Sequence, residues 1–277
     1  MRIVSFNDNG TARVGVRVGE RVEVRPSAAS PLDLVYDAPA HAPSGERAVS
    51  ELDLLPPVPH PGKIVCIGLN YRKHAEEGGN PIPDYPAVFL RGLTSLVPHG
   101  ASMLRPPCSD KLDWEAELAI VIGKTATRVR KAQALGHVAG YACFNDGSVR
   151  DYQRRSTQWT MGKNFDRTGG FGPDLVTADE LPPGAAGLRI ASRVNGQTMQ
   201  DGDTADMIFD TAALIEILSE AMTLEPGDVI ATGTPAGVGY ARKPPLFLKP
   251  GDVCEIEIAG IGILSNTVAD AARSSGR

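Results

Sequence analysis

Three acidic side chains open a segment that is otherwise apolar. In LDWEAELAIVIG, residues 112–123, Asp113, Glu115 and Glu117 precede the run AIVIG. Residues two apart lie on the same face of a β-strand, so the three carboxylates share one face. The opposite face then carries Trp114, Ala116, Leu118 and Ile120. Like charges on one face destabilise a sheet unless they are solvated or a cation lies among them, and a bound divalent cation is the simplest such partner.

A further carboxylate, Asp146, ends a second predicted strand, GYACFND. Glu115 and Glu117 from one strand and Asp146 from another would make an all-oxygen site. Such a site suits the hard divalent ions Mg²⁺, Mn²⁺ and Ca²⁺, and Mg²⁺ would leave water positions open for substrate. The alternative is a set of solvated acids on an edge strand, and the spacing alone leaves both possibilities open.

Two cations follow Asp146 in the chain. Arg150 lies four residues beyond it in SVRDYQ, so a helical turn would bring the guanidinium back over the same site. Arginine is suited to binding a carboxylate through two hydrogen bonds. Lys163, in WTMGKNFD, would bind an enolate oxygen or a substrate carboxylate if it lies near a metal. The alternative for both residues is an ordinary surface cation.

A histidine and a glutamate, His74 and Glu77, lie three residues apart in NYRKHAEEGG. On a helix this spacing places both side chains on one face. A carboxylate that orients an imidazole makes a base able to activate water. Two glycines and Pro81 follow, which suits a lid made of residues 70 to 84. The alternative is a solvated helical turn.

A glycine-rich loop, ATGTPAGVG, follows a predicted strand at residues 231–239. It lacks the Gly-Lys-Ser/Thr ending of a phosphate-binding P-loop, and the sequence after it is not helical, which argues against nucleotide binding. The loop can still present backbone N–H groups and Thr234 to an anionic ligand.

Short strands and turns must position these side chains. The chain contains 30 Gly and 22 Pro, and such punctuation favours many short strands. The pattern is mainly β with a few helices and does not alternate strictly between strand and helix. Strands are predicted at KIVCIGLN, AVFLR, EAELAIVIG, HVAGYACF, LRIASRVNG, DVIATG and VCEIEIAGIGILSNTV. The clearest helix is TAALIEILSEAM, capped by Asp210, with Ala213, Ile217 and Ala221 on one face and Leu214 and Leu218 beside them.

The chain divides by composition near residue 62. Residues 1–62 are predicted to form a small N-terminal β-region, a meander with turns at residues 7–10 and near Gly19, and a Pro-rich linker ending in LLPPVPHPGK. Residues 63–277 are predicted to form the main, catalytic domain.

Charge and cysteine usage narrow the class of protein. The formal net charge is −5 and no basic block is present, which argues against a nucleic-acid partner. No signal peptide is expected, and no apolar run approaches the roughly 20 residues of a membrane helix, so no membrane partner is expected. The four cysteines include no CxxC pair, and three lie in or beside apolar runs. Buried free thiols and a cytoplasmic location are therefore expected.

Taken together, the motifs resemble the fumarylacetoacetate hydrolase family, in particular its short bacterial branch. The resemblance covers roughly residues 63–268 and depends on the order ExE, ND with RDxQ, GKxFD and TGTPxGVG. It implies a mixed β-sandwich or β-roll of that family's C-terminal-domain type after a small N-terminal β-region, assembled as a homodimer. It also implies a lid dyad and one Mg²⁺ or Mn²⁺ ion per subunit, with Ca²⁺ as another candidate. The implied metal ligands are Glu115, Glu117 and Asp146, the lid dyad is His74 and Glu77, and the substrate or outer-shell residues are Arg150, Gln153, Lys163 and Thr234.

The function predicted from these features is metal-dependent hydrolysis of a C–C bond in a β-diketo acid such as an acylpyruvate or fumarylpyruvate. His74 would activate the water, and Lys163 and Arg150 would stabilise the enolate. The alternative on the same site is an oxaloacetate-type decarboxylase, or a tautomerase or isomerase of 2-oxo and 2-hydroxy-dienoic acids from aromatic catabolism. An alternative of another class is a non-catalytic metal- or ligand-binding β-protein.

Overall fold

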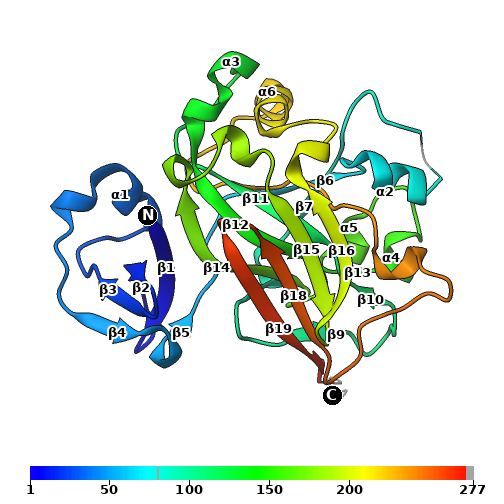
Figure 1. The fold of residues 1–277 in the computed structure, drawn as a ribbon, viewed down its shortest axis with the longest axis horizontal. Helices are drawn as coiled ribbons and strands as arrows, with labels where there is room; N and C mark the ends of the chain where they lie inside the picture. The colour runs from blue at the N-terminus through cyan, green and yellow to red at the C-terminus, as the bar shows by residue number, and fades with distance from the viewer. Residues whose placement is uncertain (80, 273–277) are drawn as a thin grey trace, which may run out of the picture.

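The computed structural model describes residues 1–79 and 81–272. Within these residues the chain is mainly β and forms a 12-stranded mixed sheet, a five-stranded sheet and a two-stranded ribbon (Figure 1). In spatial order the large sheet contains β4 (Glu46–Ala48), β3 (Arg21–Val24), β2 (Thr11–Val18), β1 (Arg2–Asp8), β14 (Gly169–Thr177), β12 (Val138–Asp146), β11 (Ala116–Ile122), β17 (Val229–Ala231), β6 (Ile64–Gly68) and β7 (Ala87–Arg91), with β5 (Asp53–Leu54) on β1 and β8 (Leu96–Pro98) on β14. The five-stranded sheet contains β16 (Gln197–Asp203), β15 (Arg189–Val194), β18 (Val253–Ile258), β19 (Gly262–Asp270) and β9 (Met103–Arg105), and the ribbon pairs β10 (Leu112–Asp113) with β13 (Ser148–Val149).

The described α-helices are short and connect the strands. They are α1 (Pro31–Asp37), α2 (Arg72–Glu77), α3 (Lys131–Ala134), α4 (Arg150–Gln153), α5 (Thr160–Lys163) and α6 (Thr211–Ala221). Across residues 1–79 and 81–272, no helix has the length and apolar character needed to cross a membrane. The predicted class, mainly β with some α in mixed sheets, is confirmed.

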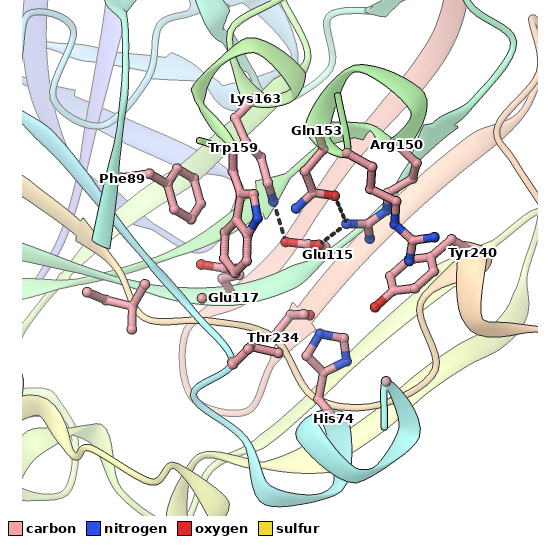
Figure 2. Close-up of a pocket in the computed structure, with 15 residues that line it drawn as sticks. His74, Phe89, Glu115, Glu117, Arg150, Gln153, Trp159, Lys163, Thr234 and Tyr240 are labelled. Atoms are coloured by element: carbon pink, nitrogen blue, oxygen red, sulfur yellow. Dashed lines mark hydrogen bonds and ion pairs between the residues drawn. The ribbon is translucent and has the colours of Figure 1, made fainter. Parts of the chain in front are cut away.

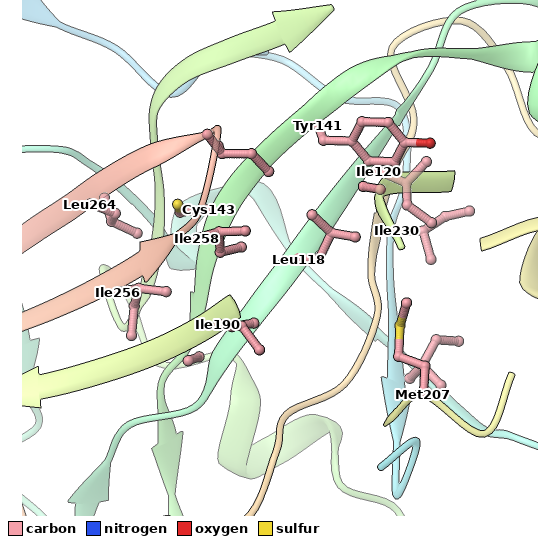
Figure 3. Close-up of a cluster of buried hydrophobic side chains, with 14 of the residues drawn as sticks. Leu118, Ile120, Tyr141, Cys143, Ile190, Met207, Ile230, Ile256, Ile258 and Leu264 are labelled. Carbon is pink, nitrogen blue, oxygen red and sulfur yellow. The ribbon is translucent and has the colours of Figure 1, made fainter. Parts of the chain in front are cut away.

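The centre of the large sheet is the antiparallel pair β11 and β12, whose residues are all buried. Leu118 and Ile120 of β11 pack in one cluster with side chains of the five-stranded sheet, among them Ile256 and Ile258 (Figure 3). Trp114 and Ala116 belong to the same cluster, so the apolar face predicted for this segment is confirmed. Alanine and valine side chains of the opposite face pack in a second cluster. The large sheet is therefore covered on both faces, and Glu117 and the preceding Glu115 lie at one end of the second face.

The N-terminal strands continue the large sheet. β1 pairs with β14, with Arg2 opposite Val176 and Ile3 opposite Leu175. The predicted meander is present, with turns between β1 and β2 and between β2 and β3. Asn9 and Gly10 both have positive φ, of 53° and 84°, which a tight hairpin turn requires. The boundary at residue 62 stays a prediction.

Each strand expected from an apolar run is present, whereas β14 was not predicted. Its sequence, GGFGPDLVT, begins with glycines and contains a proline, a composition that favours loops. The structure explains Gly169, because a Cβ there would lie 2.7 Å from the Arg91 guanidinium. The buried Arg91 side chain therefore occupies the space that a side chain at residue 169 would need. The glycine is required by packing against a distant residue, so the local sequence does not identify this segment as a strand.

The helix predicted at residues 211–222 is α6, and the Asp210 side chain accepts the N–H of Ala213 at 2.8 Å as expected for a cap. The predicted buried face is wrong by about one residue. Leu214 and Leu218 are buried as expected, but Ala221 is exposed and Ile215 is buried in its place. The register of the face is set by packing against α3 and the turn Pro183–Ala185, which periodicity does not include.

All four cysteines are free thiols. Cys66, Cys143 and Cys254 are buried and Cys108 is exposed. The prediction of buried free thiols is confirmed for the three that lie in or beside apolar runs.

Candidate active site

Three buried carboxylates meet where β11 and β12 lie side by side. Glu117 is the second residue of β11, Glu115 lies directly before that strand, and Asp146 is the last residue of β12. The N–H of Asp146 donates to the carbonyl of Glu115 at 3.0 Å, which fixes the register. One oxygen from each of the three carboxylates lies within 4.8 Å of the others. All three residues are at most 5% exposed beside a central strand pair, so the alternative of solvated edge-strand acids is wrong.

Lys163 bridges two of these carboxylates. Its Nζ lies 2.7 Å from Glu115 Oε2 and 2.6 Å from Asp146 Oδ2, and it is buried at the end of α5 (Figure 2). Arg150 Nη1 donates to the other oxygen of Glu115 at 2.6 Å. Burial alone would raise the pKa of Glu115, but Lys163 and Arg150 together lower it to about 2. Glu115 is therefore ionised at neutral pH, and both cations are buried rather than ordinary surface residues.

Glu117 differs from its two neighbours because none of the described Lys, Arg or His side chains lies within ion-pair distance of it. Its carboxylate accepts one hydrogen bond, from Gly233 N–H at 2.9 Å. Burial, with the charges of Asp146 and Glu115 beside it, raises the pKa of Glu117 well above the ordinary value. A buried acid without a counter-charge, next to two others at ligand spacing, needs an added positive charge.

The charge count of the cluster supports the same conclusion. Three buried cations, Arg91, Arg150 and Lys163, lie against four buried carboxylates, Asp113, Glu115, Glu117 and Asp146. One negative charge therefore stays unmatched when all the groups are ionised. An all-carboxylate donor set is the kind that Mg²⁺ and Mn²⁺ prefer, so the three acids fit a divalent metal ion.

Asp113, in the ribbon strand β10, organises the wall of the site. Its carboxylate accepts Arg150 Nε at 2.7 Å and the N–H groups of Gly239 and Tyr240 at 2.8 and 3.0 Å. Asp113 therefore orients Arg150 and holds the end of the glycine-rich loop. Arg150 reaches the site as predicted, because its guanidinium contacts Glu115 as well as Asp113, but the predicted route needs a correction. The helix α4 starts at Arg150 itself, so the residues between it and Asp146 do not form the expected helical turn.

Arg91, which the sequence did not single out, is the cation that binds Asp146 together with Lys163. Arg91 Nη1 lies 2.5 Å from Asp146 Oδ1, and Nη2 donates to Thr168 Oγ1 at 2.9 Å. Both side chains of the ion pair are fully buried. The available signal was an arginine at the end of the apolar run AVFLR, where a charge in a core strand calls for a partner.

His74 lies on α2 and is only 6% exposed. Its Nδ1 lies 3.4 Å from Glu77 Oε2, so the predicted pairing on one helix face is present. Burial would raise the pKa of Glu77, but the hydrogen bonds from His74 and from the N–H of Gly237 lower it below the ordinary value. The imidazole rises into the cavity from α2, while Lys163 approaches from α5 (Figure 2). Lid motion stays a prediction, and residue 80 of the expected lid lies outside the described residues.

The glycine-rich loop after β17 serves the site in a way that differs from the expectation. Two of its N–H groups, from Gly233 and Gly237, donate to the protein carboxylates Glu117 and Glu77 rather than standing ready for a ligand. Thr234 lines the cavity, and its Oγ1 accepts Gln200 Nε2 at 2.8 Å. The loop therefore links the predicted metal site to the predicted dyad.

These residues enclose a cavity of about 240 Å³. The predicted residues His74, Glu115, Glu117, Arg150, Gln153, Lys163 and Thr234 all line it, while Glu77 and Asp146 lie behind this lining. One wall, which the sequence did not predict, is aromatic: Phe89 and Trp159 pack edge to face with ring centroids 5.7 Å apart. A Cβ at Gly68 would overlap the Trp159 ring, so this glycine makes room for the wall. Tyr240 lines the cavity near Arg150.

The fold and this site define the class. Residues 63–269 match the family model described as Fumarylacetoacetate (FAA) hydrolase C-terminal, and the chain belongs to this family of enzymes. The resemblance inferred from the motifs is confirmed, and the alternative of a non-catalytic binding protein is set aside.

Particular relatives are similar over most of their length. The chain is 44% identical to "Oxaloacetate tautomerase FAHD2A, mitochondrial" of Homo sapiens over 221 residues, which are 79% of this chain and 70% of that protein. It is 45% identical to "Oxaloacetate tautomerase YisK" of Bacillus subtilis (strain 168) over 225 residues, 80% of this chain and 74% of that protein. The crystal structure of 2-hydroxyhepta-2,4-diene-1,7-dioate isomerase from Mycobacterium marinum superimposes with a TM-score of 0.82 at 33% identity, covering 99% of this chain and all of that one.

Proposed function

We propose that the protein is a metal-dependent tautomerase that interconverts the enol and keto forms of a 2-oxo dicarboxylic acid of the oxaloacetate type. The observation that carries the proposal is the placement of His74 in a small cavity that Lys163, Glu115 and Glu117 also line, with Asp146 behind them. One base and one fixed ammonium are the groups that a proton shift between carbon and oxygen requires. The names of two relatives at 44% and 45% identity support the choice of substrate.

The residues have distinct roles in this proposal. Glu115, Glu117 and Asp146 would hold Mg²⁺ or Mn²⁺, which when bound would supply the charge that polarises the 2-oxo acid. Arg150 Nη2 is buried and has no hydrogen-bond partner among the described residues, which supports assigning it to the substrate's 1-carboxylate. Gln153 accepts Arg150 Nη1 at 3.0 Å and so orients that guanidinium, and Thr234 offers a hydroxyl to the substrate.

The proton transfer itself falls to His74 and Lys163. In the keto-to-enol direction, neutral His74 takes a proton from carbon 3, and the electron pair of that C–H bond becomes the carbon 2–carbon 3 double bond. The negative charge that develops on the 2-oxygen lies against the Lys163 ammonium, and water then protonates this oxygen. His74 returns its proton to solvent, and the reverse sequence converts enol to keto. Glu77 keeps the imidazole in one orientation throughout.

Hydrolysis of an acylpyruvate is the second candidate, and the His74–Glu77 pair is the observation that favours it. A base oriented by a carboxylate can activate water, which attack on a carbonyl needs and tautomerisation does not. Decarboxylation of oxaloacetate would use the same cavity and the same stabilisation of an enolate by Lys163.

One set of assays separates the three reactions. The purified protein, with Mg²⁺ or Mn²⁺, is given enol oxaloacetate, and the ultraviolet absorbance of the enol is followed together with pyruvate. Faster loss of enol without pyruvate supports tautomerisation, whereas pyruvate and CO₂ indicate decarboxylation. Pyruvate and acetate from acetylpyruvate indicate hydrolysis. The proposal is overturned if enol decay is no faster than with metal alone.

A further inference from the structure

One cation that lines the cavity has no acidic partner. Lys163 and Arg150 are paired with buried carboxylates, and His74 with Glu77. Arg154 also lines the cavity and is exposed, and no described carboxylate lies within ion-pair distance of it. An unpaired guanidinium at the wall of a substrate cavity has its donors available for an anion.

The position of Arg154 is set by the structure around it. It directly follows α4, and its N–H donates to the Arg150 carbonyl at 3.2 Å. Its Cζ lies 4.4 Å from the centroid of the Tyr240 ring, and so does the Cζ of Arg150. The backbone of Tyr240 is in turn fixed by Asp113. Stacking on a held ring orders the Arg154 side chain before any ligand arrives, which reduces the entropy lost on binding.

The order of groups along the cavity gives Arg154 a specific place. Glu115 binds Arg150, Arg150 stacks on Tyr240, and Tyr240 stacks with Arg154. Arg154 therefore lies one helical turn after Arg150, which contacts Glu115, and the two arginines stack on the same Tyr240 ring. The facing wall, Phe89 and Trp159, carries no charge. A substrate whose 2-oxo acid end lies at the three acids can meet a second positive charge here.

We propose that Arg154 is a specificity-determining residue that binds the second carboxylate of a 2-oxo dicarboxylic acid. This inference rests on the proposed function, since it assumes that the 2-oxo acid end of the substrate lies at the metal site. Arg154 selects dianionic substrates over analogues in which the far carboxylate is esterified or absent. It takes no part in the proton transfer, which belongs to His74.

The test compares oxaloacetate with its 4-ethyl ester, which differs in the far carboxylate alone. Wild-type protein is expected to prefer oxaloacetate in kcat/KM. Arg154→Gln should raise KM for oxaloacetate by about tenfold, the size expected for a charged hydrogen bond at a partly exposed site, with little change in kcat. KM for the ester should stay the same, so the preference should disappear. Arg154→Lys should restore part of it, because it keeps the charge and loses the planar fork.

Arg155→Gln is the matched control. Arg155 is also exposed, but it stacks on Tyr152, 3.7 Å from the ring centroid, and does not line the cavity. This variant should leave both substrates unchanged. Oxalate, which has no far carboxylate, should inhibit wild type and Arg154→Gln equally.

Two results would overturn the inference and leave the proposed function standing. One is an Arg154→Gln protein that still prefers oxaloacetate to the ester as wild type does. The other is an equal loss on both substrates, which would make Arg154 a structural residue. If wild type tautomerises neither compound, the proposed function itself fails, and the two failures are therefore distinguishable.

Discussion

Glu117 accepts a hydrogen bond from Gly233 at 2.9 Å and has no cationic partner among the described residues, although Glu115, two residues away, has two. The two glutamates lie two residues apart in the chain and yet have opposite electrostatic surroundings. Burial with neighbouring acids raises the pKa of Glu117, while Lys163 and Arg150 lower that of Glu115 to about 2. Of the three acids, Glu117 is the one whose charge most needs a metal ion.

Glu117→Gln should abolish Mn²⁺ binding and tautomerase activity while the fold survives. The substitution removes a ligand and at the same time removes a poorly compensated buried charge, so the metal-free variant should be at least as stable as wild type. Calorimetric titration with Mn²⁺ and thermal unfolding without metal measure the two effects. Glu20→Gln, at an 88% exposed side chain, is the control. Unchanged Mn²⁺ affinity in Glu117→Gln would exclude Glu117 as a ligand.

Metal binding should release a proton and should strengthen as pH rises. At pH values above 4.5, the ordinary pKa of a glutamate, Glu117 is still protonated in the folded, metal-free protein. In the unfolded chain the same carboxyl group has lost its proton. The folded state then binds more protons than the unfolded one, so metal-free stability falls with rising pH until the raised pKa is passed. Above about pH 5, Glu115 is ionised in both the folded and the unfolded chain, so it does not change how stability depends on pH.

The corresponding measurement is thermal unfolding with and without Mn²⁺ from about pH 5 to about pH 8. The rise in Tm caused by Mn²⁺ should grow across this range, and calorimetry in buffers of different ionisation enthalpy should detect the released proton. A Tm increase independent of pH, with no proton release, would contradict the assignment.

His74→Ala should slow tautomerisation by roughly 10²–10⁴-fold, the usual contribution of a general acid–base residue. Acylpyruvate cleavage, if the protein catalyses it, should fall by a similar factor because it needs an activated water. Decarboxylation of oxaloacetate should fall by less than about tenfold, since it needs only a stabilised enolate. The rates must be compared at saturating Mg²⁺. Equal losses in all three would mean that His74 closes the cavity rather than transferring protons.

Arg91→Met should destabilise the protein by about 3 kcal/mol, because it leaves the buried Asp146 with one of its two cationic partners. Arg105→Gln is a matched control, since it removes a pair with Asp270 in which both side chains are partly exposed. Its cost should stay below about 1 kcal/mol. Urea unfolding of both variants measures the difference. Equal costs would show that the Arg91 pair does not hold the site together.

The protein should form a homodimer of about twice 29.3 kDa, as the resemblance implied. We place the interface at β7, a strand that ends the large sheet, because Val88 and Leu90 are 38% and 48% exposed on its outer face. Met161 of α5, 65% exposed, belongs to a helix tied to this strand, because Asn164 donates to the Leu90 carbonyl at 3.0 Å. Light scattering should give a dimer for wild type and a monomer for Leu90→Lys. A monomeric wild type would contradict the predicted dimer. A Leu90→Lys variant that is still dimeric would show that the interface is not at β7.

Much of the site was predictable from local sequence. The alternation in LDWEAELAIVIG places Glu115 and Glu117 on one face whatever the rest of the fold does, and the spacing of His74 and Glu77 pairs them on any helix. The order of the motifs identified the family, and the apolar runs located most of the strands of the main sheets. Each of these inferences depends on neighbours within a few residues, where backbone geometry is the same in every protein.

Tertiary structure decided what depends on partners far apart in the chain. Arg91 pairs with Asp146, which is 55 residues further along the chain. Residue 169 must be a glycine because the Arg91 side chain lies directly beside it. The burial that raises the pKa of Glu117 and the stacking of Arg154 on Tyr240 arise only when separate strands and loops meet. A sequence pattern shows the periodicity within one helix or strand. The pairing of buried charges and the shape of a cavity depend on residues from several elements, and only the folded chain brings these residues together.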